Sequence, residues 1–98
     1  MSGKKINIDA GRMKDRNILH DYIRDIFSIE DSFGRNLDAM HDVLSEISED
    51  YELVFSTDDL RSICQDEFAY KAMLVMGKAA EENPHLQIHF SEYETPSI

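Results

Sequence analysis

The amino-acid sequence predicts an α/β fold: a three-stranded parallel sheet with packed helices in the order β-α-α-β-α-α-β. Two observations predict it. Short runs of strand length, apolar or alternating, stand near the beginning, the middle and the end of the chain. Between them lie two pairs of segments with apolar residues at helical spacing. Strands separated by helical connections of this length favour parallel pairing with right-handed crossovers.

The first half of the chain contains one predicted strand and two predicted helices. Residues 5–9 alternate apolar and polar side chains, as a short strand does. Residues 15–27 follow as a helix whose expected apolar face is Ile18, Leu19, Tyr22, Ile23 and Ile26. After a break at residues 28–34, a helix is expected over residues 36–48. Its apolar stripe consists of Leu37, Met40, Leu44 and Ile47.

The second half repeats this alternation of strand and helices. Residues 51–55 form an apolar run of strand length. The segment Ser56-Thr57-Asp58-Asp59 supplies capping side chains for a short helix that ends near Cys64, and Asp66 can cap the next helix. The expected buried face of that helix is Phe68, Ala72, Val75, Met76 and Ala79. Asn83-Pro84 ends it, and residues 86–90 alternate as the last strand.

Length and composition predict one globular domain over residues 1–90, with residues 91–98 as a flexible tail. The 98 residues are 42% apolar, and they contain neither a run long enough to span a membrane nor a signal peptide. Cys64 is the only cysteine, so no internal disulfide can form, and a cytoplasmic location fits best. We expect Cys64 to be a small buried apolar group rather than a nucleophile.

Charge is the main anomaly of the composition. The net charge is −10, and it is unevenly distributed: residues 25–52 hold nine acidic residues and one basic residue, whereas residues 1–16 hold five basic and two acidic residues. Such a field repels nucleic acids and anionic membranes and attracts basic proteins. The alternative explanation is simple solubility, which composition by itself favours.

Few residue patterns point to catalysis or to a cofactor. The glycines form no phosphate loop, and no metal-ligand spacing is present, so no cofactor and no metal are expected. Asp38, His41 and Asp42 would need further ligands to hold a metal, and nothing obvious buries a carboxylate for acid–base chemistry. His20, His85 and His89 are expected to be surface or strand-face residues. The protein is therefore not predicted to be an enzyme.

The helix predicted at residues 36–48 suggests a different task. Asp38 and Asp42 lie one turn apart beside its apolar stripe, together with Ser45 and Glu49. A carboxylate on a rigid helix can take the place of a phosphate in a basic active site, because it accepts charge-assisted hydrogen bonds from arginine and lysine. Gly34 before the helix lets the backbone approach a partner closely.

With these residues, the chain resembles the barstar family of intracellular ribonuclease inhibitors. The match is strongest in the segment Phe33-Gly34-Arg35-Asn36-Leu37-Asp38-Ala39-Met40-His41-Asp42-Val43-Leu44, where the family pattern runs aromatic-Gly-x-Asn-Leu-Asp-Ala-Leu-aromatic-Asp-x-Leu. The order of elements is also similar from about residue 4 to residue 90. The resemblance implies that the protein binds a basic, barnase-like ribonuclease and covers its active site.

The resemblance also implies which residues contact the partner. Asp42 corresponds to the family's central aspartate, which fills the enzyme's phosphate site, and Asp38 to a second acidic contact. The other implied contacts are Ser32, Phe33, Gly34, Asn36, Leu37, His41, Ser45, Lys78 and Glu82. Three of them depart from the family: Ser32 replaces a tyrosine, His41 an aromatic residue and Lys78 a glutamate. These changes favour a different cognate partner.

Three functions therefore remain open at the level of the sequence. The first is inhibition of a ribonuclease by a helix aspartate that mimics substrate phosphate. The second is binding of another basic protein, such as a nuclease of unrelated fold, without ribonuclease inhibition. The third is a carboxylate-dependent hydrolase, which requires a metal or an enclosed carboxylate. None of them involves direct contact with nucleic acid or a membrane.

Overall fold

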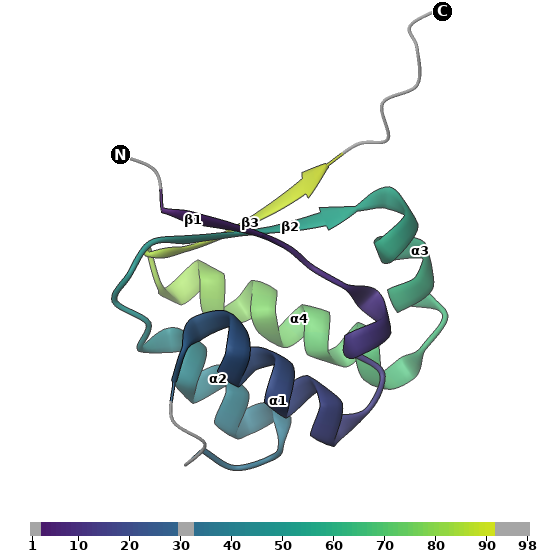
Figure 1. Cartoon of the computed structure of the whole chain (residues 1–98), viewed down its shortest axis with the longest axis horizontal. Coiled ribbons are helices and arrows are strands. Elements are labelled where there is room, and N and C mark those ends of the chain that lie inside the picture. The colour runs from purple at the N-terminus through teal and green to yellow at the C-terminus, as the bar shows by residue number, and fades with distance from the viewer. Residues whose placement is uncertain (1–2, 30–32, 92–98) are drawn as a thin grey trace, which may run out of the picture.

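The computed structural model describes residues 3–29 and 33–91 and has the predicted α/β architecture (Figure 1). Its sheet consists of the parallel strands β1 (Lys4–Asn7), β2 (Tyr51–Ser56) and β3 (Leu86–Ser91), in the spatial order β1-β2-β3. A 3-10 turn (Ala10–Arg12), α1 (Arg16–Phe27) and α2 (Leu37–Ser45) connect β1 to β2. Helices α3 (Thr57–Cys64) and α4 (Glu67–Glu82) connect β2 to β3. The predicted order β-α-α-β-α-α-β is confirmed.

The two faces of the sheet differ in polarity. In the register of the strands, Leu53 of β2 stands between Ile6 and Ile88, on the face that packs against the helices. One residue earlier, Glu52 stands between Lys5 and Gln87 on the outer face. Figure 1 shows α1, α2 and α4 together on one side of the sheet. Parallel sheets are usually covered on both faces, and here the polar outer row makes a one-sided arrangement possible.

Local signals fix where the helices begin. The side chains of Asp15, Asn36, Ser56 and Asp66 each accept a hydrogen bond from a backbone N–H in the first turn of the helix that follows. These bonds satisfy donors that have no partner within a helix. The caps expected from Ser56 and Asp66 are confirmed.

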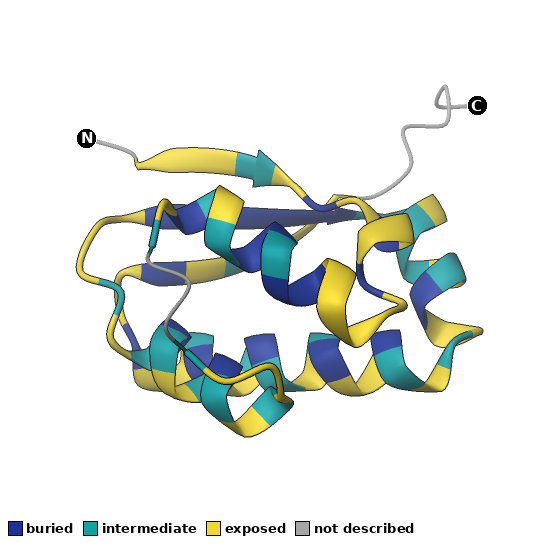
Figure 2. Cartoon of the chain, turned by 60° about the horizontal axis from the view of Figure 1, so that its bottom comes forward, coloured by how far each residue is buried: buried dark blue, intermediate teal, exposed yellow. Residues whose placement is uncertain are grey.

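The core lies between the sheet and the helices. Figure 2 shows buried residues along most of β2 and on the inward sides of α1 and α4. The largest fully buried side chains are Ile8, Met13, Ile23, Leu44, Leu53, Phe55, Ile63, Met76 and Leu86. Within the described part of the chain, no helix is both long enough and apolar enough to cross a membrane.

Two predictions about α1 are wrong, and both have the same cause. Ile18, expected in the core, has 47% of its surface exposed, and His20, expected at the surface, has 4% exposed. The buried stripe of α1 centres on Leu19, Ile23 and Phe27. At about 100° per residue, position 20 falls beside this stripe and position 18 falls on the far side.

The environment of Cys64 was also predicted wrongly. Cys64 is the last residue of α3, and it is exposed. The buried residue of this short helix is Ile63. Neighbouring positions on a helix point about 100° apart, so burial of Ile63 turns Cys64 outward.

Candidate protein-binding site

Helix α2 is held rigidly at its beginning. Asn36 has extended backbone geometry, and its side chain accepts a 2.8 Å hydrogen bond from the N–H of Ala39. The Asn36 carbonyl accepts the first helical bond, from Met40 N–H at 3.0 Å. Met40 and Leu44 are buried at 3% and 0% exposure. The apolar stripe thus fixes the rotation of α2 about its axis.

The end of α2 is fixed by a residue distant in sequence. The helix ends at Ser45 and not at the predicted residue 48. The buried Asn83, directly after α4, donates from Nδ2 to the carbonyls of Leu44 and Ile47, both at 2.9 Å. Its Oδ1 accepts a bond from His85 N–H at 2.9 Å. Asn83 therefore gives the Leu44 carbonyl a second donor beside the Ile47 N–H at 3.4 Å, and it gives the Ile47 carbonyl a donor just beyond the end of α2.

The two aspartates of α2 point into solvent. The Asp42 side chain is 80% exposed, and Asp38, in the first turn, is also exposed. Within the described part of the chain, the Asp38 carboxylate makes no hydrogen bond or ion pair. The N-terminal end of a helix dipole favours a negative charge at Asp38. The helix therefore presents two fixed carboxylates one turn apart.

His41 connects the exposed face of α2 to α4. Its Nε2 lies 2.9 Å from Glu82 Oε1, and its Nδ1 lies 3.7 Å from Asp42 Oδ1. Nε2 is buried and is not aligned with the carboxylate as a hydrogen-bond donor. The two groups are therefore close together, but no hydrogen bond joins them. Lys78 is exposed on α4, one turn before Glu82. The structure thus brings together His41, Asp42 and Glu82.

Ser45 is arranged differently from the aspartates. The residue is half-buried, and its Oγ is buried with no hydrogen-bond partner among the described residues. The hydroxyl thus does not face solvent in this arrangement.

The 33–37 loop, which we define as Phe33 to Leu37, leads into α2 and packs against α1. The ring of Phe33 stacks on that of His20, with 4.1 Å between centroids and 26° between planes. Leu37 is half-buried and packs against the core, whereas Gly34 and Asn36 are exposed. Ser32 lies outside the described residues.

Gly34 is explained by space and not by an unusual backbone angle. No described glycine has positive φ. A Cβ on Gly34 would lie 3.2 Å from Asn36 Nδ2 and 3.3 Å from the Cβ of Ala39. A side chain here would crowd the residue that caps α2, so Gly34 leaves room for the cap.

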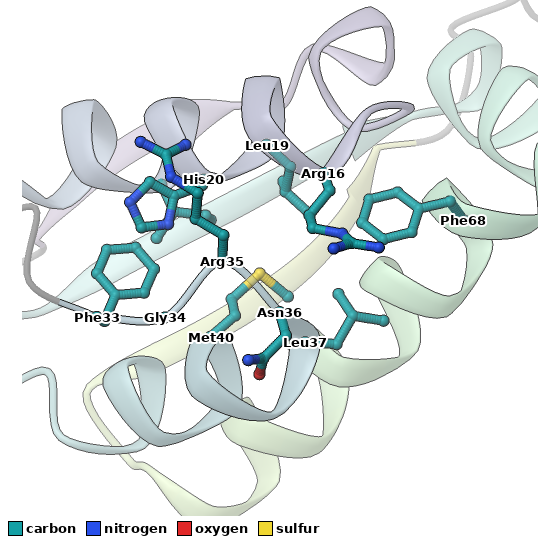
Figure 3. Close-up of a pocket in the computed structure, with 11 residues that line it drawn as sticks. Arg16, Leu19, His20, Phe33, Gly34, Arg35, Asn36, Leu37, Met40 and Phe68 are labelled. Carbon is teal, nitrogen blue, oxygen red and sulfur yellow. The ribbon is translucent and has the colours of Figure 1, made fainter.

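Figure 3 shows the crevice between α1, this loop and the first turns of α2 and α4. The space inside it is about 10 Å³, which admits about one water molecule and nothing larger. Beside it lies an open groove with the basic residues Lys14, Arg16 and Arg35 in its lining. No group of three metal-ligating side chains is found among the described residues.

Sequence reasoning missed two residues that support this site, His20 and Asn83. A finer helical projection around Leu19 and Ile23 would have placed His20 beside the buried stripe. No sequence pattern signals that Asn83 bonds to α2, since its partners lie 36 and 39 residues away.

The fold and the site together define a class of protein: a small α/β protein that presents exposed, helix-mounted carboxylates suited to a positively charged partner. The chain belongs to the barstar family, because the family model described as Barstar (barnase inhibitor) matches residues 4–91. The family is one of protein inhibitors. Comparison with curated proteins finds no relative that matches the chain.

Proposed function

We propose that this protein is an intracellular inhibitor that binds and covers the basic active site of a barnase-like ribonuclease, and that it has no catalytic activity of its own. Asp42 takes the place of a substrate phosphate, and Asp38 adds a second carboxylate. The 33–37 loop, with Glu82 on α4, closes the rim. Family membership supports this role.

The observation that carries the proposal is the setting of Asp42. Its side chain is 80% exposed, yet it stands on a helix capped by Asn36 at one end and bonded by Asn83 at the other. A carboxylate held in this way loses little conformational freedom when it docks. Paired with arginine or lysine, it forms charge-assisted hydrogen bonds that compete with those of a phosphate.

The test is inhibition of a barnase-like ribonuclease by the wild-type protein and by Asp42→Ala. Removing a central contact of this kind costs at least about 2 kcal/mol, which is about thirtyfold in affinity. The matched control is Asp58→Ala, because Asp58 is an exposed aspartate on α3, outside the proposed site. Inhibition that survives Asp42→Ala unchanged would refute the phosphate mimic.

Charge supports a separate kinetic expectation. The acidic segment of residues 25–52 should steer a basic enzyme toward α2. Added salt should then slow association more than it changes dissociation. An association rate that does not depend on salt would contradict the steering.

A second candidate is binding of another basic protein without ribonuclease inhibition. The position of Glu82 favours it, since Glu82 Oε1 already lies 2.9 Å from His41 Nε2 within the protein. The exposed Lys78 adds a positive charge one turn away. A protein that fails to inhibit barnase-like ribonucleases, but binds a basic nuclease of unrelated fold through Asp42, would favour this candidate.

A further inference from the structure

His20 links helix α1 to the proposed binding loop. It comes from a different element and lies 13 residues before Phe33, on which its ring stacks at 4.1 Å. With 4% of its surface exposed, His20 is too deeply buried to touch a docked protein. Figure 3 shows the two rings next to each other at one end of the crevice. His20 can therefore affect binding only indirectly, and its stack on Phe33 is a contact that reaches the loop.

A second contact anchors the loop to the same helix. Arg35 Nη1 lies 3.4 Å from Asn17 Oδ1 and 3.6 Å from Asp21 Oδ1. His20 and Asp21 lie three and four residues after Asn17, so both are next to Asn17 on the same side of α1. The loop is thus held to α1 on both sides of Gly34.

Packing between these two contacts leaves the 33–37 loop little freedom to move. The crevice lined by His20, Phe33 and Leu37 holds only about 10 Å³ of free space. If Phe33 moved away, both rings would lose their contact, because dispersion attraction falls steeply when the distance between two groups increases even slightly. Gly34 itself has no side chain with which to restrain the backbone. The restraint on the 33–37 loop comes from its neighbours on α1.

We infer that His20 is a positioning residue for partner binding: it fixes Phe33 and so holds the 33–37 loop in the shape that meets the partner. The inference rests on the proposed function, because it takes this loop as part of the interface. A loop already fixed before docking binds more tightly, since less conformational freedom is lost on association. The specific contribution of His20 is a flat ring that stacks on Phe33.

The first test uses the free protein. His20→Ala removes the stack, whereas His20→Phe keeps an aromatic ring at this position. Backbone NMR order parameters of residues 33–37 should fall from about 0.85 to below about 0.6 in His20→Ala, and stay high in His20→Phe. The control is Ile63→Val, a core change on α3 away from the loop, which should leave these values unchanged.

The second test measures binding to a barnase-like ribonuclease. His20→Ala should bind about tenfold more weakly than the wild type, His20→Phe should restore binding, and Ile63→Val should bind as the wild type does. If His20→Ala does not fold, Phe33→Leu removes the other half of the stack and should loosen the loop in the same way. Order parameters that do not change in the folded variant overturn the inference.

The two tests separate this inference from the proposed function. If Asp42→Ala leaves binding intact but His20→Ala still loosens the loop, the phosphate mimic is wrong and the positioning of the loop stands. If Asp42→Ala abolishes binding and His20→Ala changes neither the loop nor the affinity, the proposed function stands and the role of His20 is refuted.

Discussion

Replacing Asn83 with alanine should destabilise the protein by about 3 kcal/mol. Asn83 is 3% exposed, and its side chain makes three hydrogen bonds, each 2.9 Å long, to Leu44, Ile47 and His85. A typical bond contributes about 1 kcal/mol net, and buried groups left without a partner cost at least as much. Since a domain of this size is stable by about 5–15 kcal/mol, the change is a large fraction of the total.

The assay is urea unfolding followed by circular dichroism, with thermal unfolding as a second measure. A loss of 3 kcal/mol should lower the midpoint temperature by roughly 12–24 °C, at about 4–8 °C per kcal/mol for this chain length. Asn83→Asp keeps the size of the side chain but places a carboxylate oxygen against two carbonyl oxygens, so it should be no more stable than Asn83→Ala.

The matched control is Gln87→Ala, because Gln87 is exposed on the outer face of β3. Exposed substitutions of this kind usually change stability by less than about 0.5 kcal/mol. A loss below about 1 kcal/mol in Asn83→Ala would refute the reasoning, since it would mean that water or relaxation replaces the three bonds.

Three further outcomes follow from the structure. Cys64 is exposed, so a thiol reagent should label it fully in the folded protein; labelling that requires denaturant would contradict this. Asn36→Ala should cost about 1 kcal/mol in urea unfolding through loss of the cap, whereas Asn36→Ser should keep most of it. Burial raises the pKa of Tyr22 above 10.0, so the unfolded state deprotonates first and stability falls above pH 10. Tyr22→Phe should flatten this fall but reduce stability at neutral pH, because it loses the 2.9 Å hydrogen bond from Asp9 N–H.

Predictions of which helix residues face the core were less secure than predictions of where a helix begins. Ser56 and Asp66 cap α3 and α4 as predicted, because each capping bond joins residues only three apart in the chain. The expected positions of Ile18, His20 and Cys64 failed, since each depends on how a helix is rotated against the sheet. Periodicity locates an apolar stripe, but the residues at its margins are assigned by packing.

The sequence by itself determined the α/β class, the order of strands and helices, and the helix that carries Asp38 and Asp42. These features arise from interactions between residues a few positions apart. Only the tertiary structure decided that Asn83 fixes the end of α2, that Glu82 lies against His41, and that His20 supports Phe33. Each of these contacts joins residues far apart in the chain, so it exists only once the helices have packed against one another and the sheet.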